Sequence, residues 1–254
     1  MIMNRIGVFD SGMGGLTILE KLVENIPNCD YIYLADEANV PYGTKTDEEL
    51  LNILKKVIKF FKLKQVDLII IACNTASCYI EELKCETTIP MFGMIDITAA
   101  EVLKNKNIKR VLLLATAQTV KHHKYDDILK KNGIEVIGIP CPGFITYIES
   151  EYKPASSYQD ALIKEQLRCV LGSDFDAVIL GCTHFGLVRS SIEKLFKNAL
   201  VISSEEATSE HLKNTETFDY NKKGFIEIYT SGDSESFNKK LTYFKDLPKV
   251  SKKI

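Results

Sequence analysis

The sequence lacks the features that mark several classes of protein. Its 254 residues carry 32 Lys and Arg against 34 Asp and Glu, so no excess positive charge points to a nucleic-acid partner. No stretch approaches the roughly 18 consecutive apolar residues that a membrane helix needs, and no tract is of low complexity. We therefore expect a globular protein that acts on a small molecule, with neither nucleic acid nor membrane as a partner.

The N-terminus and the cysteines exclude further classes. Residues 1–10 enter a strand pattern at once, without the charged segment, apolar segment and cleavage site of a signal peptide, so we expect a cytoplasmic protein. The seven cysteines are an odd number, and none are paired as Cys-x-x-Cys, which argues against disulfide staples and dithiol exchange. Most of these cysteines are expected to be small buried hydrophobes.

One segment of the sequence is present in two copies. Asp67-Leu-Ile-Ile-Ile-Ala-Cys73-Asn74-Thr75 is matched 109 positions later by Asp176-Ala-Val-Ile-Leu-Gly-Cys182-Thr183-His184. Each copy has an Asp, an aliphatic run, a small residue and a cysteine followed by polar residues, which is typical of a buried strand ending in a thiol. Two matched thiols suggest one reaction in which each thiol acts on a different face of the substrate.

Apolar runs of strand length alternate with amphipathic segments along the whole chain. The runs expected to form strands are 6–9, 31–34, 68–72, 91–95, 111–115, 136–139, 178–180, 201–203 and 225–229. The segments expected to be helical are 16–25, 47–63, 99–105, 122–132, 159–171 and 190–196, with another helix from Ser234. Continuous aliphatic strands between helices predict a three-layer α/β architecture with mainly parallel sheets covered on both faces.

The repeat predicts two lobes. Residues 6–12 run from a strand through a polar turn into a helix, as residues 111–117 do. We place residues 1–96 in the first lobe and 97–204 in the second. We assign 205–254 to the first lobe, whose sheet the strand at 225–229 would extend, although periodicity alone also permits a cap on the second lobe.

Polar residues follow four of the predicted strands, where ligands of parallel sheets bind. The clusters are Asp10-Ser11, Cys73-Asn74-Thr75, residues 116–119 and Cys182-Thr183-His184. A ligand between two facing lobes would touch all four. The glycine-rich turn at residues 10–15 could cradle a carboxylate or phosphate, but it fits neither a dinucleotide fingerprint nor a P-loop.

The spacing around the two thiols limits the reactions that they could catalyse. Six residues separate Cys182 from Arg189, which does not fit the Cys-x5-Arg spacing of a thiol phosphatase. Zinc ligation by Cys73, Cys182 and His184 stays open, although the spacings of structural zinc motifs are absent and we predict no metal. Two thiols flanking one carbon suit removal of a proton from one face and its return to the other, which inverts a stereocentre. His184 could assist Cys182 and Asp10 could assist Cys73; each also has a plain structural interpretation, as a packed histidine or a helix cap.

Several motifs resemble, in order and spacing, those of the cofactor-independent aspartate/glutamate racemase superfamily, and of its glutamate racemases in particular. They are residues 9–17, Asp36 with Pro41-Tyr42-Gly43, residues 72–77, Thr116 with Thr119-Val120 and Tyr125, Cys141-Pro142 with Glu149, residues 181–184, and Gly232-Asp233 with Phe237. The resemblance spans nearly the whole chain. A histidine after the second Cys-Thr favours the glutamate branch over the aspartate racemases, which commonly carry Glu there.

The resemblance implies a fold and an activity: two flavodoxin-like lobes related by a pseudo-twofold axis, a site at their interface, and interconversion of L- and D-glutamate without a cofactor. Cys73 would deprotonate D-glutamate and Cys182 L-glutamate, supported by Asp10 and His184, with Asp36 and Glu149 as further acidic participants. The substrate-binding residues would be Asp10, Ser11, Pro41, Tyr42, Gly43, Cys73, Asn74, Thr75, Thr116, Thr119, Cys182, Thr183 and His184. A homodimer that supplies D-glutamate for peptidoglycan is also implied.

The sequence departs from the family pattern at a few positions. Phe185-Gly186 stands where Tyr-Pro is usual, His122 for Ser, Ile97 for Pro, Ala35 for Gly and Ser203 for Asp. None of these removes a thiol or its assigned partner, so they bear on rate, substrate fit and regulation. The alternatives are a racemase for aspartate or another amino acid, and a thiol hydrolase or non-catalytic binding protein on the same scaffold.

Overall fold

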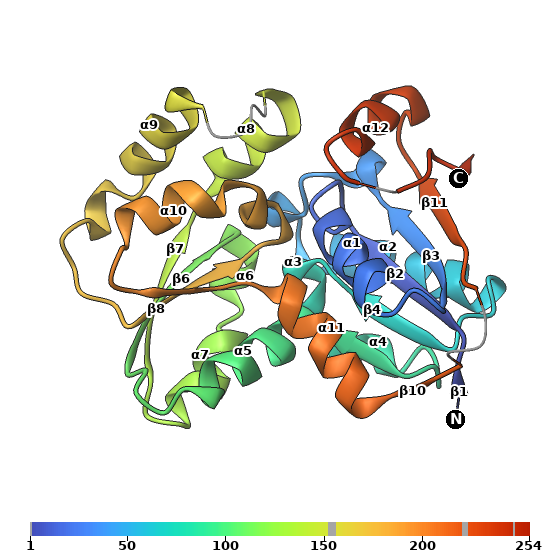
Figure 1. Cartoon of the computed structure of the whole chain (residues 1–254), viewed down its shortest axis with the longest axis horizontal. Helices are drawn as coiled ribbons and strands as arrows, with labels where there is room; N and C mark the ends of the chain where they lie inside the picture. The colour runs from blue at the N-terminus through green and yellow to red at the C-terminus, as the bar shows by residue number, and fades with distance from the viewer. Residues whose placement is uncertain (1, 152–155, 220–222, 246) are drawn as a thin grey trace.

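Two parallel sheets stand side by side in the computed structural model, which describes residues 2–151, 156–219, 223–245 and 247–254 (Figure 1). The strands of the first sheet are β2 (Arg5–Asp10), β3 (Asp30–Ala35), β4 (Leu68–Ile71), β5 (Met91–Gly93), β11 (Ile226–Thr230) and β12 (Lys252–Lys253). Those of the second are β6 (Arg110–Ala115), β7 (Glu135–Pro140), β8 (Ala177–Gly181) and β9 (Leu200–Ile202). A small separate sheet pairs β1 (Ile2–Met3) with β10 (Thr217–Phe218). All these pairings are parallel, which confirms the predicted fold class.

The two sheets share one strand order. It is β12-β11-β3-β2-β4-β5 in the first and β7-β6-β8-β9 in the second, so β3-β2-β4-β5 matches β7-β6-β8-β9. In each set the first strand in sequence lies between the second and the third, as in flavodoxin-like folds. The two copies of the repeated segment form β4 and β8, the third strand of each set. The predicted strand at 225–229 returns to the first sheet, where β11 pairs with β3.

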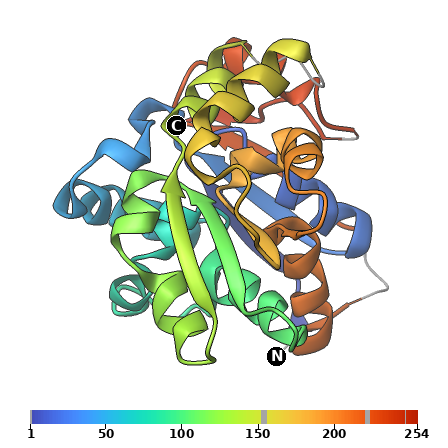
Figure 2. The same ribbon diagram turned by 90° about the vertical axis from the view of Figure 1, so that its left-hand side faces the viewer.

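Helices cover both faces of each sheet (Figures 1 and 2). The α-helices are α1 (Leu16–Asn25), α2 (Asp47–Leu63), α3 (Asn74–Ser77), α4 (Ile80–Lys84), α5 (Met94–Lys104), α6 (Ala117–Lys121), α7 (Lys124–Lys130), α8 (Pro142–Glu151), α9 (Ser157–Gln166), α10 (Arg189–Leu195), α11 (Ser204–Thr215) and α12 (Ser234–Leu241). The 3-10 helices are η1 (Glu37–Asn39), η2 (Tyr42–Thr44), η3 (Arg168–Val170) and η4 (Thr183–Val188). No helix among the described residues is long and apolar enough to cross a membrane.

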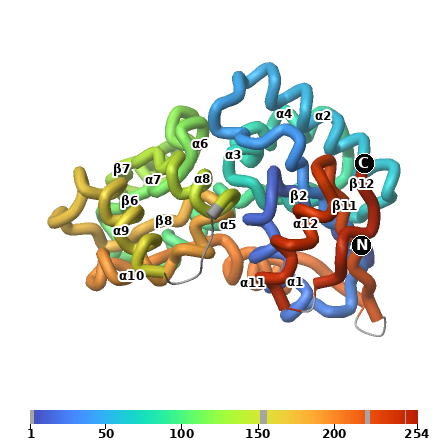
Figure 3. The backbone as a smooth tube through the Cα atoms, turned by 90° about the horizontal axis from the view of Figure 1, so that it is seen from above, coloured from blue at the N-terminus to red at the C-terminus, as the bar shows by residue number. Residues whose placement is uncertain are grey.

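The buried strands and the amphipathic helices explain this layering. In β4, Leu68 and Ile70 belong to one hydrophobic cluster, whereas Ile69 and Ile71 belong to the other, so both faces of the strand are covered. Helix α2 starts in a capping box of Thr46 with Glu49 and buries residues at helical spacing, from Leu50 to Phe61. Helices α5 and α11 pack against each other between the two sheets (Figures 1 and 3).

The structure corrects four predicted boundaries. The strand predicted at 91–95 ends at Gly93, and α5 begins at Met94 rather than at residue 99, because the N–H of Met94 is held by the Ser77 hydroxyl at 3.0 Å. The helix predicted at 122–132 begins at Lys124, since His123 has a left-handed φ of 54° that separates α6 from α7. The helix predicted at 159–171 ends at Gln166 and is followed by η3. Such boundaries depend on single contacts and backbone conformations that periodicity does not encode.

Candidate active site

The carboxyl ends of β4, β6 and β8 and the turn after β2 meet at one cavity. The cavity has a volume of about 390 Å³ and takes residues from both sheets. Predicted site residues that line it are Ser11, Pro41, Tyr42, Gly43, Cys73, Asn74, Thr75, Thr116, Glu149, Cys182, Thr183 and His184. Strand ends of two facing sheets thus bring both thiols of the repeat to one space.

Cys73 lies two residues after the end of β4 and is buried at the N-terminus of α3. Its Sγ lies 3.8 Å from the Ser11 hydroxyl, which comes from the turn after β2. Burial, with a smaller contribution from the negative charge of Asp10, raises the pKa of the Cys73 thiol. Cys73 therefore holds its proton at neutral pH in the absence of a ligand.

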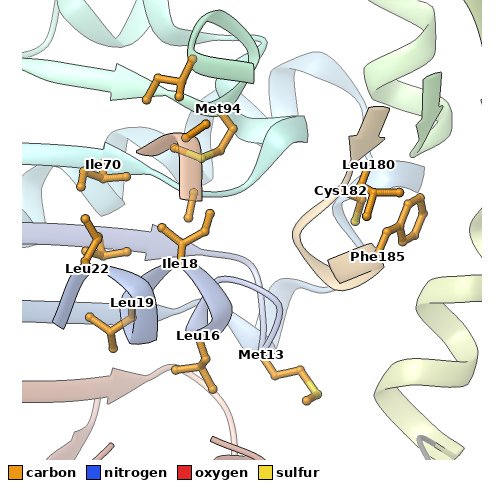
Figure 4. Packing of buried hydrophobic residues seen from close by; sticks show 14 of the residues in the cluster. Met13, Leu16, Ile18, Leu19, Leu22, Ile70, Met94, Leu180, Cys182 and Phe185 are labelled. Atoms are coloured by element: carbon orange, nitrogen blue, oxygen red, sulfur yellow. The ribbon is translucent and has the colours of Figure 1, made fainter. Parts of the chain in front are cut away.

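Cys182 lies after β8 and has a different neighbour. Its Sγ is 3.7 Å from Nδ1 of His184, whose Nε2 lies 2.5 Å from Oε1 of Glu149 on α8. Figure 4 shows Cys182 beside Leu180 and Phe185, across from Met13 and the start of α1. The two copies of the repeat thus end in matched thiols whose surroundings differ.

Burial alone would lower the pKa of His184, but its hydrogen bonds to Cys182 and Glu149 and the Glu149 charge raise the pKa well above the ordinary value. Burial alone would raise the pKa of Glu149, and the contacts with His184 and Lys240 outweigh it, so the pKa of this carboxyl lies below its ordinary value. The pair is therefore an imidazolium and a carboxylate at neutral pH.

Three predicted residues, Asp10, Asp36 and Thr119, do not line the cavity but contact residues that do. Asp10 is fully buried and accepts from the N–H of Gly12 at 3.0 Å and from the Thr183 hydroxyl at 3.1 Å. Its carboxylate therefore joins the turn after β2 to the Cys182 strand end, while the hydrogen bond of Cys73 goes to Ser11. Burial raises the pKa of Asp10, against the charge of His184 and the hydrogen bonds of the carboxylate.

Asp36 and Thr119 form hydrogen bonds with residues that line the cavity. The Tyr42 hydroxyl donates to Asp36 at 2.6 Å, and Ser231 donates to the other carboxylate oxygen at 2.7 Å, so Asp36 holds Tyr42 in place. The hydroxyls of Thr75 and Thr119 lie 2.8 Å and 2.9 Å from that of Thr116. This group joins α3 of the first sheet to α6 of the second.

Asn74, which lines the cavity, has an unused hydrogen-bond donor. Its side chain is 2% exposed, and its Oδ1 accepts from the Tyr125 hydroxyl at 2.7 Å. The amide nitrogen Nδ2 is buried without a hydrogen-bond partner. Because a buried unpaired donor is costly, Nδ2 points to a ligand with an oxygen acceptor.

Sequence reasoning missed part of this site. Tyr125 belonged to a matching motif without a role, and the polar residues gave no sign of Ile145 and Thr146, which belong to the α8 wall of the cavity. Nothing drew attention to Lys240, whose Nζ donates to Glu149 from α12. No group of three or more His, Cys, Asp or Glu side chains among the described residues is arranged to hold a metal ion.

The fold and the site define a two-lobed α/β protein with a cavity between the lobes that is lined by paired thiols. The chain belongs to the Asp/Glu/Hydantoin racemase family, whose sequence model matches residues 6–212. A glutamate racemase of Aquifex aeolicus is 37% identical over 237 residues, which are 92% of this chain and 91% of that protein.

Solved structures give the same likeness. The glutamate racemase isoform RacE1 of Bacillus anthracis superposes with a TM-score of 0.92 at 26% identity, over 99% of this chain and 97% of that one. A glutamate racemase of Francisella tularensis in complex with D-glutamate superposes with a TM-score of 0.86 at 30% identity, over 99% and 96% of the two chains.

Proposed function

We propose that this protein is a cofactor-independent glutamate racemase that supplies D-glutamate for peptidoglycan synthesis. The observation that carries the proposal is that Cys73 and Cys182, the matched thiols of an internal repeat, line one cavity from two facing sheets. The size of the cavity, about 390 Å³, admits a small amino acid between them. Relatives named glutamate racemase, and one solved with D-glutamate, support the choice of substrate.

The reaction needs two thiols with opposite protonation. In the L-to-D direction the Cys182 sulfur, as thiolate, takes the Cα proton of L-glutamate, which leaves a carbanion-like state planar at Cα. The Cys73 thiol then gives its proton to the opposite face, which forms D-glutamate and leaves Cys73 as the thiolate. The D-to-L direction runs these two transfers in reverse.

The surroundings of the thiols suit these roles. Burial keeps the proton on Cys73, so this thiol is ready to donate. Beside Cys182, protonated His184 directs Nδ1 at the sulfur and can stabilise negative charge there. Glu149 holds the imidazolium from its other nitrogen.

The substrate would be held by donors that the protein leaves unpaired or adaptable. The Nδ2 donor of Asn74 and the hydroxyls of Thr75, Thr116 and Thr183 suit carboxylate oxygens of glutamate. Because they project from the ends of rigid strands and helix starts, they can stabilise negative charge as it develops without large rearrangement.

The test follows the Cα proton. We expect the protein in deuterium oxide, without added cofactor, to racemise either enantiomer of glutamate with incorporation of solvent deuterium at Cα, seen by NMR. Cys73→Ala and Cys182→Ala should each lower kcat by more than about 10³-fold, because each removes one of two obligatory proton carriers. Cys169→Ala, which changes an exposed cysteine, is the matched control. Racemisation at the unmodified rate in both active-site variants contradicts the proposal, and faster turnover of aspartate would reassign the substrate.

We also propose the two lobes as residues 1–96 with 205–254 and residues 97–204. Their limits fall within α5 and α11, which pack on each other, so these helices would form the connection about which the lobes move. A cytoplasmic location and a homodimer are proposed with them, on the family resemblance. Sedimentation velocity should then give twice the mass of the chain, and a monomeric mass at working concentration would contradict the dimer.

A further inference from the structure

A lysine of the last α-helix lies between two carboxylates beside the candidate site. Nζ of Lys240 donates to Oε1 of Glu37 and to Oε2 of Glu149. The side chains of the three residues are 19%, 9% and 18% exposed, so the group is largely buried. Lys240 comes from α12, beyond the segment 6–212 that the family model matches.

The two oxygens of the Glu149 carboxylate have separate partners. Oε2 accepts from Lys240, whereas Oε1 faces Nε2 of His184 at 2.5 Å. The other ring nitrogen of His184 lies 3.7 Å from Sγ of Cys182. A continuous series of contacts therefore runs from Lys240 through Glu149 and His184 to one of the two thiols.

We propose that Lys240 is a positioning residue for the proton transfer at Cys182. It fixes the rotation of the Glu149 carboxylate, so that Oε1 holds the His184 ring with Nδ1 aimed at the sulfur. This inference rests on the function proposed above. It assigns a role to the C-terminal helix, which carries none of the cavity-lining residues.

The geometry also explains why a lysine is needed there. Glu149 sits among Glu37, Tyr33, His184 and Lys240, and burial by itself favours its neutral form. Burial raises the pKa of Glu37 even with Lys240 beside it. Burial would lower the pKa of Lys240, but its two carboxylate partners outweigh this and raise it, so the lysine stays charged. Without the lysine, two neighbouring carboxyls would share one imidazolium, and the pKa of Glu149 would rise.

The experiment compares Lys240→Met and Lys240→Arg with Lys239→Met, a matched change at an exposed lysine of the same helix. In Lys240→Met we expect kcat to fall about 10-fold or more, with KM changed by less than about threefold, because a charge-assisted bond that orients a reacting group is lost. The acidic limb of the kcat/KM profile should move to higher pH, since Glu149 then takes up its proton at higher pH. Lys240→Arg should restore most of the rate, and Lys239→Met should behave as the unmodified protein.

A double-mutant cycle with Glu149→Gln tests whether Lys240 acts through Glu149. If it does, Lys240→Met should lower kcat by a much smaller factor in the Glu149→Gln background than in the unmodified protein. The proposal is overturned if Lys240→Met lowers kcat by the same factor in both backgrounds. It is also overturned if a folded Lys240→Met variant shows no shift in the acidic limb of its kcat/KM profile. Thermal unfolding of each variant identifies a loss of rate that comes from misfolding, and in that case the comparison uses Lys240→Gln at a temperature where it is folded.

A second readout separates this inference from the proposed function. The rate at which iodoacetamide alkylates Cys182, followed by mass spectrometry of its peptide, requires no turnover of glutamate. We expect Lys240→Met to slow this alkylation several-fold and to leave alkylation of exposed Cys169 unchanged. If alkylation of Cys182 is slower in Lys240→Met but the protein does not racemise glutamate, the positioning role stands and the proposed function is rejected. If the protein racemises glutamate but Lys240→Met changes neither Cys182 alkylation nor the pH profile, the function stands and the positioning role is rejected.

Discussion

Asp67 and Asp176 hold equivalent places in the two sheets. Oδ2 of Asp67 accepts from the backbone N–H groups of residues 4 and 5, at 2.9 Å each. Oδ2 of Asp176 accepts from those of residues 109 and 110, at 2.7 Å and 2.8 Å. Each aspartate precedes the third strand of its sheet and fastens the start of the first. Each copy of the repeat thus has, at one end of the strand, an aspartate that binds two backbone N–H groups at the start of the neighbouring strand, and a thiol at the other end.

Asp67→Ala should lower the free energy of unfolding by about 2 kcal/mol, because two backbone donors in a partly buried setting lose their acceptor. Asp176→Ala should cost less, since Asp176 is exposed and water can replace it. Urea unfolding measures both differences. Asn variants, which keep an acceptor oxygen, should recover part of each loss, and kcat should stay unchanged throughout. A larger loss for Asp176→Ala contradicts the expectation.

Asn74 and Tyr125 give a prediction about substrate affinity. Asn74→Ala removes the unpaired Nδ2 donor and should raise KM about 10-fold or more. Tyr125→Phe leaves Oδ1 of Asn74 without its donor and frees the amide to rotate, so KM should rise about threefold to 10-fold. Tyr158→Phe, at an exposed tyrosine, is the control. Steady-state kinetics with both enantiomers check these effects; a lower kcat at constant KM would exclude the binding role.

The Glu149–His184 ion pair should make stability depend on pH. The lowered pKa of Glu149 contributes stability above its ordinary value of 4.5, and this is lost as pH falls through the folded pKa. The raised pKa of His184 contributes stability below 6.5, and this is lost as pH rises through the folded value. The pair therefore stabilises most fully between these two limits.

In that window Glu149→Gln should lower the free energy of unfolding by about 2 kcal/mol, because it replaces a charge-assisted bond by a neutral one. The difference between the variant and the unmodified protein should shrink as the pH falls from 4.5 to about 2, the folded pKa of Glu149, and again as the pH rises through the raised pKa of His184, because one partner of the pair is then discharged. Urea unfolding across this range provides the measurement. A difference that is independent of pH would show that the carboxylate charge contributes nothing.

Gly14 gives a prediction about the contact between the sheets. A Cβ there would lie 2.5 Å from the Thr183 hydroxyl and 2.7 Å from the backbone nitrogen of His184. Because backbone cannot yield as a flexible side chain does, Gly14→Ala should displace the Cys182 strand end, with a fall in kcat/KM of about 10-fold or more. In Gly138→Ala the Cβ meets only the Val120 side chain, at 3.0 Å, and no backbone atom, so kcat/KM should change little. Equal rates in the two variants would refute the argument.

Much of the architecture was predictable because it depends on local patterns. Aliphatic runs and amphipathic spacing predicted the helices α1 and α2 with their observed bounds. Where a tertiary contact or a special backbone conformation sets the helix start, as at Met94 and His123, periodicity placed the boundary wrongly. The Ser77 hydroxyl that holds Met94 is 17 residues away.

The sequence predicted which residues make up the candidate site, but not which of them form hydrogen bonds with one another. Strand order brings Cys73 and Cys182 to one cavity, and the sequence itself contained the matched strand ends that make this so. That Asp10 bonds to Thr183, 173 residues away, depended on how the two sheets face each other.

By itself the sequence determined a repeated strand with a thiol at its end, a parallel α/β fold and a family, because strand burial, spacing and motif order are properties of the chain read in one dimension. Only the tertiary structure decided that Cys73 contacts Ser11 rather than Asp10, and that Glu149 and Lys240 lie behind His184. Lys240 reaches Glu149 across 91 positions and Glu149 reaches His184 across 35, contacts that local periodicity cannot encode. Hydrogen bonds act over a few ångströms in space, so these contacts exist only once both sheets and the last helix have packed together.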